Sequence, residues 1–286
     1  PARLCGKRAG TSGKIELLLL SRLSAGRWRA LVRPGRRMGA GTVCEVSGAG
    51  EAATAEVLQV EADGTRIVQL SDETVIDRAG AVPLPPYIHR PLEDAGRYQT
   101  VYARADGSVA APTAGLHFTE ELLDGVRAMG AETVFVTLHV GWDSFRPVWG
   151  EDPSAHRMHS EWWELGPEAA NAINRAKQEG RRVVSVGTTA VRLLEQAASL
   201  HAGGPVSDSG DGRVLSAGSG WADLFILPGY RFRVVDALAT NFHLPRSTLL
   251  MLTSAFAGRD LVLEAYHRAI DSRYRFYSFG DAMFIV

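Results

Sequence analysis

The stretch RVVSVGTTAVRLLEQAAS, residues Arg182–Ser199, decides the fold class. Its β-branched beginning predicts a strand over Arg182–Val186. Gly187–Thr189 then forms a small-residue turn, and Ala190–Ser199 has the composition and apolar spacing of a helix. A strand that passes through such a turn directly into a helix is typical of a layered α/β sheet.

Strands and helices alternate over the rest of the chain from residue 97 onward. The predicted helices are Thr119–Met129, Pro167–Glu179, Ser247–Ala257 and Asp260–Asp271, and the predicted strands are Ala131–Val140, Leu224–Leu227 and Arg233–Thr240. Between them, His201–Gly220 is rich in Gly, Ser and Asp and predicts a loop. The alternation predicts a layered α/β domain with a mixed sheet over residues 83–286.

The sequence before residue 83 has a different rhythm. Its predicted strands are Lys14–Ser21, Arg27–Arg33, Thr42–Val46, Ala53–Glu61 and Thr65–Leu70. Asp63-Gly64, between the last two, is a typical hairpin turn. Short strands at regular spacing without a helix predict a small all-β barrel over residues 1–82. The proline-rich segment PLPPY that starts at Pro83 marks the boundary between the two domains.

Composition excludes several classes of protein. Of the 286 residues, 45% are hydrophobic and 22% are charged, which argues against intrinsic disorder, a fibrous repeat or a polytopic membrane protein. The apolar run Leu17–Leu20 is too short to span a bilayer. The two cysteines, Cys5 and Cys44, lack CxxC spacing, so we expect reduced thiols in a cytoplasmic protein that has no membrane association.

Charge is distributed unevenly along the chain, although the formal net charge is −1. Residues 1–37 carry ten basic side chains and a single acidic one, Glu16, whereas residues 38–96 carry three basic and ten acidic ones. The basic segment falls within the predicted barrel and is compatible with contacts to a polyanion. The chain starts at Pro1 with strand-like sequence, and we expect further residues upstream of it.

Polar side chains follow the predicted strands of the α/β domain. The groups concerned are Thr137 with His139, Gly187–Thr189, Thr240 with Asn241 and His243, and Thr113 with His117 before a helix. Ligands of open α/β sheets bind beyond the carboxyl ends of the strands, so these groups are expected to converge on one crevice. The alternative for each Thr or Asn is a role as a helix cap or turn former.

The turn Gly187–Thr189 lies at a predicted helix N-terminus, where free backbone N–H groups favour an anion. It has neither the lysine of a phosphate-binding loop nor the spacing of a dinucleotide fold, and a simple helix cap is the alternative. His117 and His243 lie in apolar sequence, where a hydrogen-bonded core histidine is the alternative to a functional one.

A metal site would have to use His156, His159 and Glu161, the set with the closest ligand spacing. The residues after Glu161 have the pattern of a strand, which would place His159 and Glu161 on one face and His156 on the other. Acid, base or hydrogen-bonding use of the histidines is therefore favoured over metal binding.

Several of these segments resemble the S-adenosylmethionine:tRNA ribosyltransferase-isomerase family of queuosine biosynthesis. The resemblance covers nearly the whole chain and keeps the order of the motifs. The matching stretches are Pro83–Ile88 (PLPPYI), Arg97–Ala103 (RYQTVYA), Gly107–Thr119 (GSVAAPTAGLHFT), Thr137–Val140 (TLHV), Met158–Glu161 (MHSE), Val186–Arg192 (VGTTAVR), Asp223–Tyr230 (DLFILPGY), Asp236–Leu252 (DALATNFHLPRSTLLML) and Tyr274–Ala282 (YRFYSFGDA).

The resemblance implies a specific reaction. Members of the family move and isomerise the ribosyl part of S-adenosylmethionine onto 7-aminomethyl-7-deazaguanine in tRNA, which gives epoxyqueuosine and releases adenine and methionine. The expected partners are S-adenosylmethionine, as a co-substrate, and a tRNA with a GUN anticodon. No prosthetic group or metal is expected, and we expect a monomer in the cytoplasm.

The resemblance also assigns roles to residues of these motifs. His117 and His243 are the leading candidates for acid and base, with His139 and His159 in reserve. The residues expected to bind S-adenosylmethionine are Arg97, Tyr98, Gln99, Thr113, Gly187, Thr188, Thr189 and Asn241. Among these, the backbone N–H groups at Thr188 and Thr189 would hold the methionine carboxylate.

The sequence departs from the family pattern in two places. The Asn-Asp-Thr-Arg motif that normally precedes the equivalent of Pro1 is absent, and Trp142 and Asp143 stand where the family has small residues. Two other functions remain open from sequence alone. One is a non-catalytic tRNA-binding protein that uses the basic N-terminal segment, and the other is a metal-dependent hydrolase built on His156, His159 and Glu161.

Overall fold

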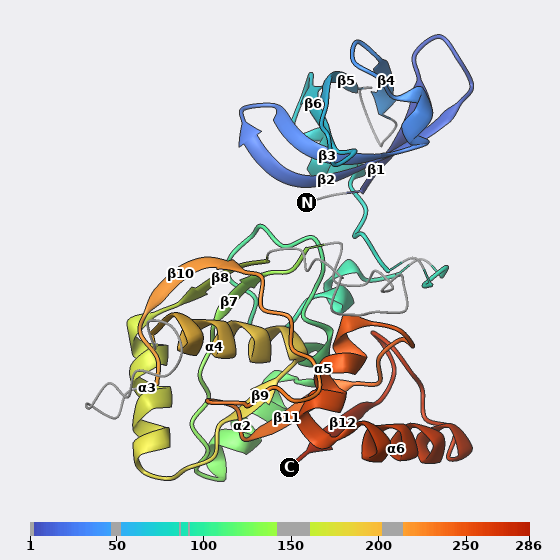
Figure 1. Ribbon diagram of the computed structural model, residues 1–286. Helices are drawn as coiled ribbons and strands as arrows, with labels where there is room; N and C mark the ends of the chain where they lie inside the picture. Colours follow the sequence, from blue (N-terminus) through green and yellow to red (C-terminus); the bar gives the residue numbers. More distant parts are fainter. Residues whose placement is uncertain (1–2, 47–52, 86, 91, 142–160, 202–213) are drawn as a thin grey trace. The chain divides into compact units, whose positions relative to one another are not determined.

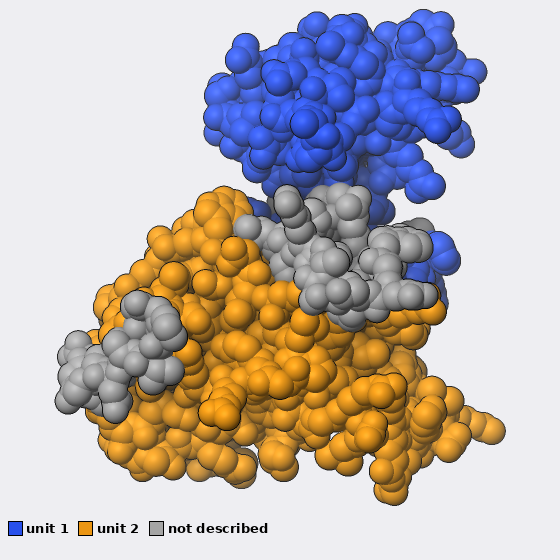
Figure 2. All heavy atoms as spheres, in the orientation of Figure 1, with its two compact units in different colours: residues 1–96, 106–110 blue, residues 97–105, 111–286 orange. Residues whose placement is uncertain are grey.

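The computed structural model describes residues 3–46, 53–85, 87–90, 92–141, 161–201 and 214–286. The chain forms two compact units, which Figure 2 shows in different colours. Unit 1 comprises residues 1–96 and 106–110, and unit 2 comprises residues 97–105 and 111–286. The domain division at residue 83 stays a prediction.

Unit 1 contains a closed barrel of six strands (Figure 1). The strands are β1 (Arg3–Arg8), β2 (Lys14–Ser24), β3 (Arg27–Arg33), β4 (Val43–Val46), β5 (Ala53–Val60) and β6 (Arg66–Leu70). They are joined in the order β1-β2-β3-β6-β5-β4, and every neighbouring pair is antiparallel. Alternate side chains point into the barrel, where Leu4, Leu17 and Val68 are completely buried.

Three short elements accompany the barrel strands. The 3₁₀ helix η1 (Gly35–Arg37) follows β3, and the helix α1 (Val75–Ala79) follows β6. Gly64 has a positive φ of 86° in the turn between β5 and β6, a backbone conformation that glycine adopts without strain. A second 3₁₀ helix, η2 (Ala95–Tyr98), lies where the first part of unit 1 ends.

Unit 2 combines helices with two small sheets (Figure 1). Its helices are η3 (Thr113–His117), α2 (Glu120–Ala128), α3 (Pro167–Gln178), α4 (Thr188–His201), α5 (Thr248–Ala257) and α6 (Arg259–Asp271). Its strands are β7 (Thr137–His139), β8 (Glu161–Leu165), β9 (Val184–Val186), β10 (Gly218–Ala222), β11 (Ala237–Asn241) and β12 (Ala282–Ile285). The main core of unit 2 includes Leu193, Val191 and Leu238, which are completely buried.

The two sheets of unit 2 differ in strand direction. In the sheet β12-β11-β9, β11 is parallel to β9 and antiparallel to β12, so this sheet is mixed. The sheet β10-β8-β7 is antiparallel throughout. The prediction of a layered α/β domain with a mixed sheet and a small β-barrel is therefore confirmed.

Helix boundaries follow the sequence signals closely. Thr119 caps α2, because its hydroxyl accepts a hydrogen bond from the backbone N–H of Leu122. Ser247 caps α5 in the same way through the backbone N–H of Leu250. None of the helices in the described part of the chain has the length and apolar character needed to cross a membrane.

The predicted strand Arg233–Thr240 begins too early, since β11 starts at Ala237. The reason is the buried Glu195 of α4, whose carboxylate accepts hydrogen bonds from the backbone N–H groups of Arg233, Val234 and Val235 at 2.9–3.1 Å. Because these N–H groups donate to a side chain, they do not pair with a neighbouring strand.

Three other strand and loop predictions also need correction. Leu224–Leu227 is not a strand, because α4 again supplies the partners: Gln196 accepts from the Leu224 N–H, and Arg192 donates to the Leu224 carbonyl. Strand β7 covers only Thr137–His139 of the predicted strand Ala131–Val140. The predicted loop His201–Gly220 extends too far, since β10 pairs with β8 from Gly218 onward.

Candidate active site

The mixed sheet brings three chain segments to one edge. Because β9 and β11 are parallel, their carboxyl ends lie at the same edge, and the residues after Val186 and at Asn241 are neighbours there. Strand β12 is antiparallel to β11 and starts opposite Asn241, at Ala282. The segment that precedes β12 therefore reaches the same edge.

Asn241, at the end of β11, connects these segments through its side-chain amide. Its Nδ2 lies 2.9 Å from Nε2 of His117 in η3 and 3.3 Å from the backbone carbonyl of Tyr277. Its Oδ1 accepts from the Thr113 hydroxyl at 3.3 Å. The predicted site residues Thr113, His117 and Asn241 thus form one cluster, which we call the Asn241 cluster.

The Tyr277 carbonyl determines the proton arrangement in the Asn241 cluster. A carbonyl oxygen only accepts hydrogen bonds, so the atom of Asn241 that faces it must be the NH₂ group. The same NH₂ group then donates to His117 Nε2, which acts as the acceptor. In the neutral ring the proton of His117 is consequently on Nδ1.

His117 is half-buried and is neutral near pH 7. Burial lowers the pKa of His117 below its usual value, and the Asp281 carboxylate opposes this shift. Asp281 is held by Arg275, whose backbone N–H donates to Asp281 Oδ2 at 2.6 Å. A neutral ring can take up a proton as a base, and it can donate that proton as an acid once it is charged.

His243 has a different environment from His117. Its side chain is buried, Nε2 shares a hydrogen bond of 2.9 Å with the Thr240 hydroxyl, and its backbone N–H donates to the Tyr266 hydroxyl at 2.8 Å. Burial lowers the pKa of His243 to about 3. At neutral pH this histidine is therefore an uncharged hydrogen-bonding group.

The pKa of His243 predicts how stability depends on pH. Below about pH 6.5 the unfolded chain takes up a proton at this histidine that the folded protein does not bind until about pH 3. Between these values the free energy of unfolding should therefore fall with decreasing pH, by up to about 1.4 kcal/mol per pH unit from this group. Urea denaturation from pH 7 to 4 should show a shallower decline for His243→Gln than for the wild type. Parallel declines in the two proteins would contradict the assignment.

Helix α4 places its N-terminus next to the Asn241 cluster. Gly187 has a positive φ of 92°, and a Cβ atom at this position would lie 3.5 Å from the Cβ of Ala114 in η3. The Gly187 N–H is used, because it donates to the Ala239 carbonyl at 2.8 Å. Thr188 is buried and Thr189 half-buried in the first turn, where backbone N–H groups lack partners within the helix.

A buried ion pair anchors α4 to the second sheet. Arg192 Nη1 lies 2.7 Å from Glu161 Oε2 of β8, and both side chains are almost fully buried. The same guanidinium donates to the carbonyls of Ala222 and Leu224. Because these bonds fix the rotation of α4, they also fix the direction in which its N-terminus points. The carboxylate of Glu161 is engaged in this way, which gives no support to a hydrolase with Glu161 as a metal ligand.

The central residue of the motif Arg97–Gln99 packs against the segment that contains Tyr277. The ring of Tyr98 is buried and packs edge-on against Phe279, with ring centroids 5.8 Å apart. Phe279 belongs to the same segment as Tyr277. Arg97 and Gln99 are exposed, and the Gln99 side-chain oxygen accepts a hydrogen bond from the backbone N–H of Thr100.

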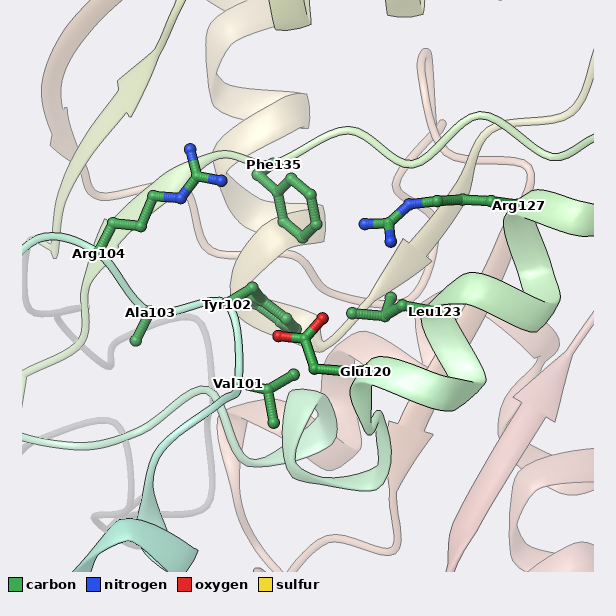
Figure 3. Close-up of a pocket in the computed structure, with 8 residues that line it drawn as sticks. All are labelled: Val101, Tyr102, Ala103, Arg104, Glu120, Leu123, Arg127 and Phe135. Atoms are coloured by element: carbon green, nitrogen blue, oxygen red, sulfur yellow. The ribbon is translucent and has the colours of Figure 1, made fainter.

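A pocket of about 160 Å³ lies beside η3 in unit 2 (Figure 3). Tyr102 and Phe135 line it with tilted rings 5.1 Å apart, and Arg104 and Arg127 flank Phe135 in this view. Tyr102 also packs against η3, where a Cβ atom at Gly115 would collide with its hydroxyl. Tyr102 therefore links the pocket, which it lines, to η3, which carries His117 of the Asn241 cluster.

His139 is not part of the Asn241 cluster. His139 lies in the other sheet and packs on Trp162 with ring centroids 5.0 Å apart. Burial lowers the pKa of His139, and Glu164 opposes this shift. Within the described chain, its buried Nδ1 has no hydrogen-bond partner. His156 and His159 lie outside the described residues, as do Trp142 and Asp143.

Sequence reasoning missed several contributors to this region. Tyr277 acts through its backbone carbonyl, which no side-chain pattern can reveal. Asp281 and Tyr102 lie within motifs that the resemblance identified, but neither was singled out. An acidic residue next to a histidine-bearing site is the signal that would have found Asp281, since a carboxylate near an imidazole changes its pKa.

Comparison with known proteins gives a consistent result. The family described as "Queuosine biosynthesis protein" matches residues 1–285. The S-adenosylmethionine:tRNA ribosyltransferase-isomerase of Dehalococcoides mccartyi is 54% identical, with 100% of this chain and 81% of the relative covered. The corresponding protein of Moorella thermoacetica is 53% identical with the same coverage. A solved S-adenosylmethionine tRNA ribosyltransferase from Thermotoga maritima is 36% identical, covers 100% of this chain and 78% of that chain, and has a TM-score of 0.47.

Proposed function

The chain belongs to the queuosine biosynthesis protein family, and we propose that it transfers and isomerises the ribosyl moiety of S-adenosylmethionine onto tRNA. The acceptor is 7-aminomethyl-7-deazaguanine in a tRNA with a GUN anticodon, and the products are epoxyqueuosine in tRNA, adenine and methionine. The observation that supports this most strongly is identity above 50% over the whole chain to relatives named for this activity.

The chemistry requires acid and base groups and a site with little water. The sulfonium of S-adenosylmethionine acidifies the adjacent ribose CH₂, so a base can remove a proton there. Departure of adenine needs a hydrogen-bond or proton donor, and the amine of the modified base must be neutral to attack. Histidines with lowered pKa values meet these needs near neutral pH.

We assign His117 as the leading acid–base residue. It is half-buried and neutral, and Asn241 orients its ring with Nε2 as the acceptor and Nδ1 as the donor. His243 supports the end of β11 as a neutral partner of Thr240, although it remains a candidate for proton transfer. His139 and His159 stay in reserve.

The N-terminus of α4 is our proposed site for the methionine carboxylate. The backbone N–H groups at Thr188 and Thr189 lie at the positive end of a helix of 14 residues, which favours an anion. The positive φ at Gly187 turns the chain from β9 into α4 at this point. Thr113 and Asn241 would contact the sugar or adenine, and Arg97–Gln99 would lie near the base or ribose.

S-adenosylmethionine acts in this proposal as a co-substrate, without a prosthetic group. Because tRNA is the other substrate, the proposal places the protein in the cytoplasm, and we propose that it acts as a monomer without membrane association.

Adenine release tests the proposed function. The purified protein should release adenine from S-adenosylmethionine only with tRNA that carries 7-aminomethyl-7-deazaguanine. The same tRNA with an unmodified guanine serves as the control. A protein that binds the modified tRNA but releases no adenine would instead be the non-catalytic binding protein. Adenine release that chelators abolish would favour the metal-dependent alternative.

A further inference from the structure

We propose that one end of the β-barrel binds the phosphate backbone of the tRNA substrate, an inference that rests on the proposed function. The barrel has two ends, and one of them carries a group of exposed cations that we call the basic end. Its members are Arg8, Lys14, Arg33, Arg36 and Arg37.

The strand pairing brings these residues together. Strand β1 ends at Arg8 and β2 begins at Lys14, so both flank the same hairpin. Strand β3 ends at Arg33, which lies opposite Glu16, near the start of β2. Arg36 and Arg37 follow immediately in η1. Neighbouring antiparallel strands thus place all five cations at one end of the barrel.

The cations of the basic end form no salt bridge with a described residue, whereas five other cations on the barrel strands and α1 do. The paired ones are Arg3 with Glu16, Lys7 with Glu45, Arg22 with Glu73, Arg29 with Glu61, and Arg78 with Asp72, at 2.6–3.1 Å. Glu16, the acid opposite Arg33, already binds Arg3. Two further acids lie in the turn after β5. There Glu61 already binds Arg29, and Asp63 accepts hydrogen bonds from Thr65.

A neighbouring arginine holds part of the basic end in place. Arg66, at the start of β6, donates to the backbone carbonyls of Gly35 at 2.8 Å and Met38 at 3.1 Å. Met38 itself is completely buried in the barrel core. The segment that carries Arg36 and Arg37 is therefore fixed on both sides, and less side-chain and backbone freedom is lost when it binds a partner.

A cluster of uncompensated positive charge favours a polyanion over a neutral partner. The five side chains are arginines and a lysine, which bind phosphate oxygens through charge-assisted hydrogen bonds. Phosphate contacts position a nucleic acid without reading its sequence. The basic end should therefore contribute to the affinity for tRNA as such, and not to the choice of anticodon.

The test compares two triple variants with the same loss of charge. The first, Arg33→Gln/Arg36→Gln/Arg37→Gln, removes three cations of the basic end. The control, Arg22→Gln/Arg27→Gln/Arg78→Gln, removes three arginines of unit 1 that lie outside the basic end. Gel-shift titration of the full chain measures the dissociation constant for substrate tRNA between about 50 and 200 mM salt, and circular dichroism confirms folding of each variant.

The first variant should bind substrate tRNA about 10- to 100-fold more weakly. The slope of log K against log salt should become shallower by about 0.9 for each phosphate that the variant no longer neutralises. A tRNA with another anticodon should bind more weakly by the same factor. The control variant should bind within about threefold of the wild type, and Arg33→Lys/Arg36→Lys/Arg37→Lys should largely retain binding.

Equally weakened binding in the first variant and in the control would overturn the proposal, as would weakening that is confined to the substrate tRNA. These results are independent of catalysis, because binding is measured without S-adenosylmethionine. Failure of the proposed function would appear separately, as wild-type protein that binds tRNA but releases no adenine.

Discussion

Replacing His117 with alanine should lower the turnover of S-adenosylmethionine with modified tRNA by about 10²- to 10⁴-fold, the range for loss of a general acid or base. The residue is half-buried and its ring contacts Asn241, so the substitution removes a titrating group whose ring the structure orients. Single-turnover kinetics at saturating tRNA would measure this effect apart from substrate binding.

The control for His117→Ala is His267→Ala, since His267 is an exposed histidine on α6. That variant should retain wild-type turnover. Unaltered turnover in a folded His117→Ala protein would show that His117 takes no part in the reaction.

Asn241→Asp tests the proton arrangement in a different way. A carboxylate cannot donate to His117 Nε2, so the ring would have to carry a proton there, and the added negative charge would raise the pKa of His117. The pH profile of turnover should shift upward as a result. A structural role for Asn241 alone would change the rate without moving this profile.

Removing the charge of Arg192 should produce the largest loss of stability. The variant Arg192→Met leaves the Glu161 carboxylate buried without its guanidinium partner, which should cost about 3–5 kcal/mol in the free energy of unfolding. The double variant Glu161→Leu/Arg192→Met removes both charges and should recover much of this loss. Urea denaturation with far-ultraviolet circular dichroism would measure both.

Arg175→Met provides the matched control for Arg192→Met. The Arg175–Glu132 ion pair has a similar distance of 2.8 Å, but both side chains are about half exposed, so its loss should cost less than about 1 kcal/mol. If Arg192→Met and Arg175→Met were equally stable, the buried pair would not anchor α4 as we describe.

Sequence patterns predicted helix caps and turns correctly, but they did not predict where every strand begins. The helix caps at Thr119 and Ser247 and the hairpin at Gly64 were predictable because they depend on residues close together in the chain. The late start of β11 was not, because Glu195 takes its hydrogen bonds from residues about 40 positions away. Tertiary contacts of this kind override local preference.

In the site, too, single residues could be predicted from nearby sequence, whereas their contacts with residues far away in the chain could not. His117 and Asn241 could be chosen from their motifs, yet their contact joins residues 124 positions apart, at the ends of η3 and β11. The neutrality of His243 follows from burial, which apolar neighbours in the sequence suggest but do not establish. The proton on His117 Nδ1 follows from a backbone carbonyl that no motif specifies.

The fate of the ribosyl group tests the central claim most directly. S-adenosylmethionine labelled either in the ribose or in the methyl group would be incubated with wild-type protein and tRNA carrying 7-aminomethyl-7-deazaguanine. The account predicts that ribose label enters tRNA in step with adenine release, that methyl label leaves in methionine, and that His117→Ala slows both events together. Methyl label in tRNA, or adenine release without ribose transfer, would contradict it.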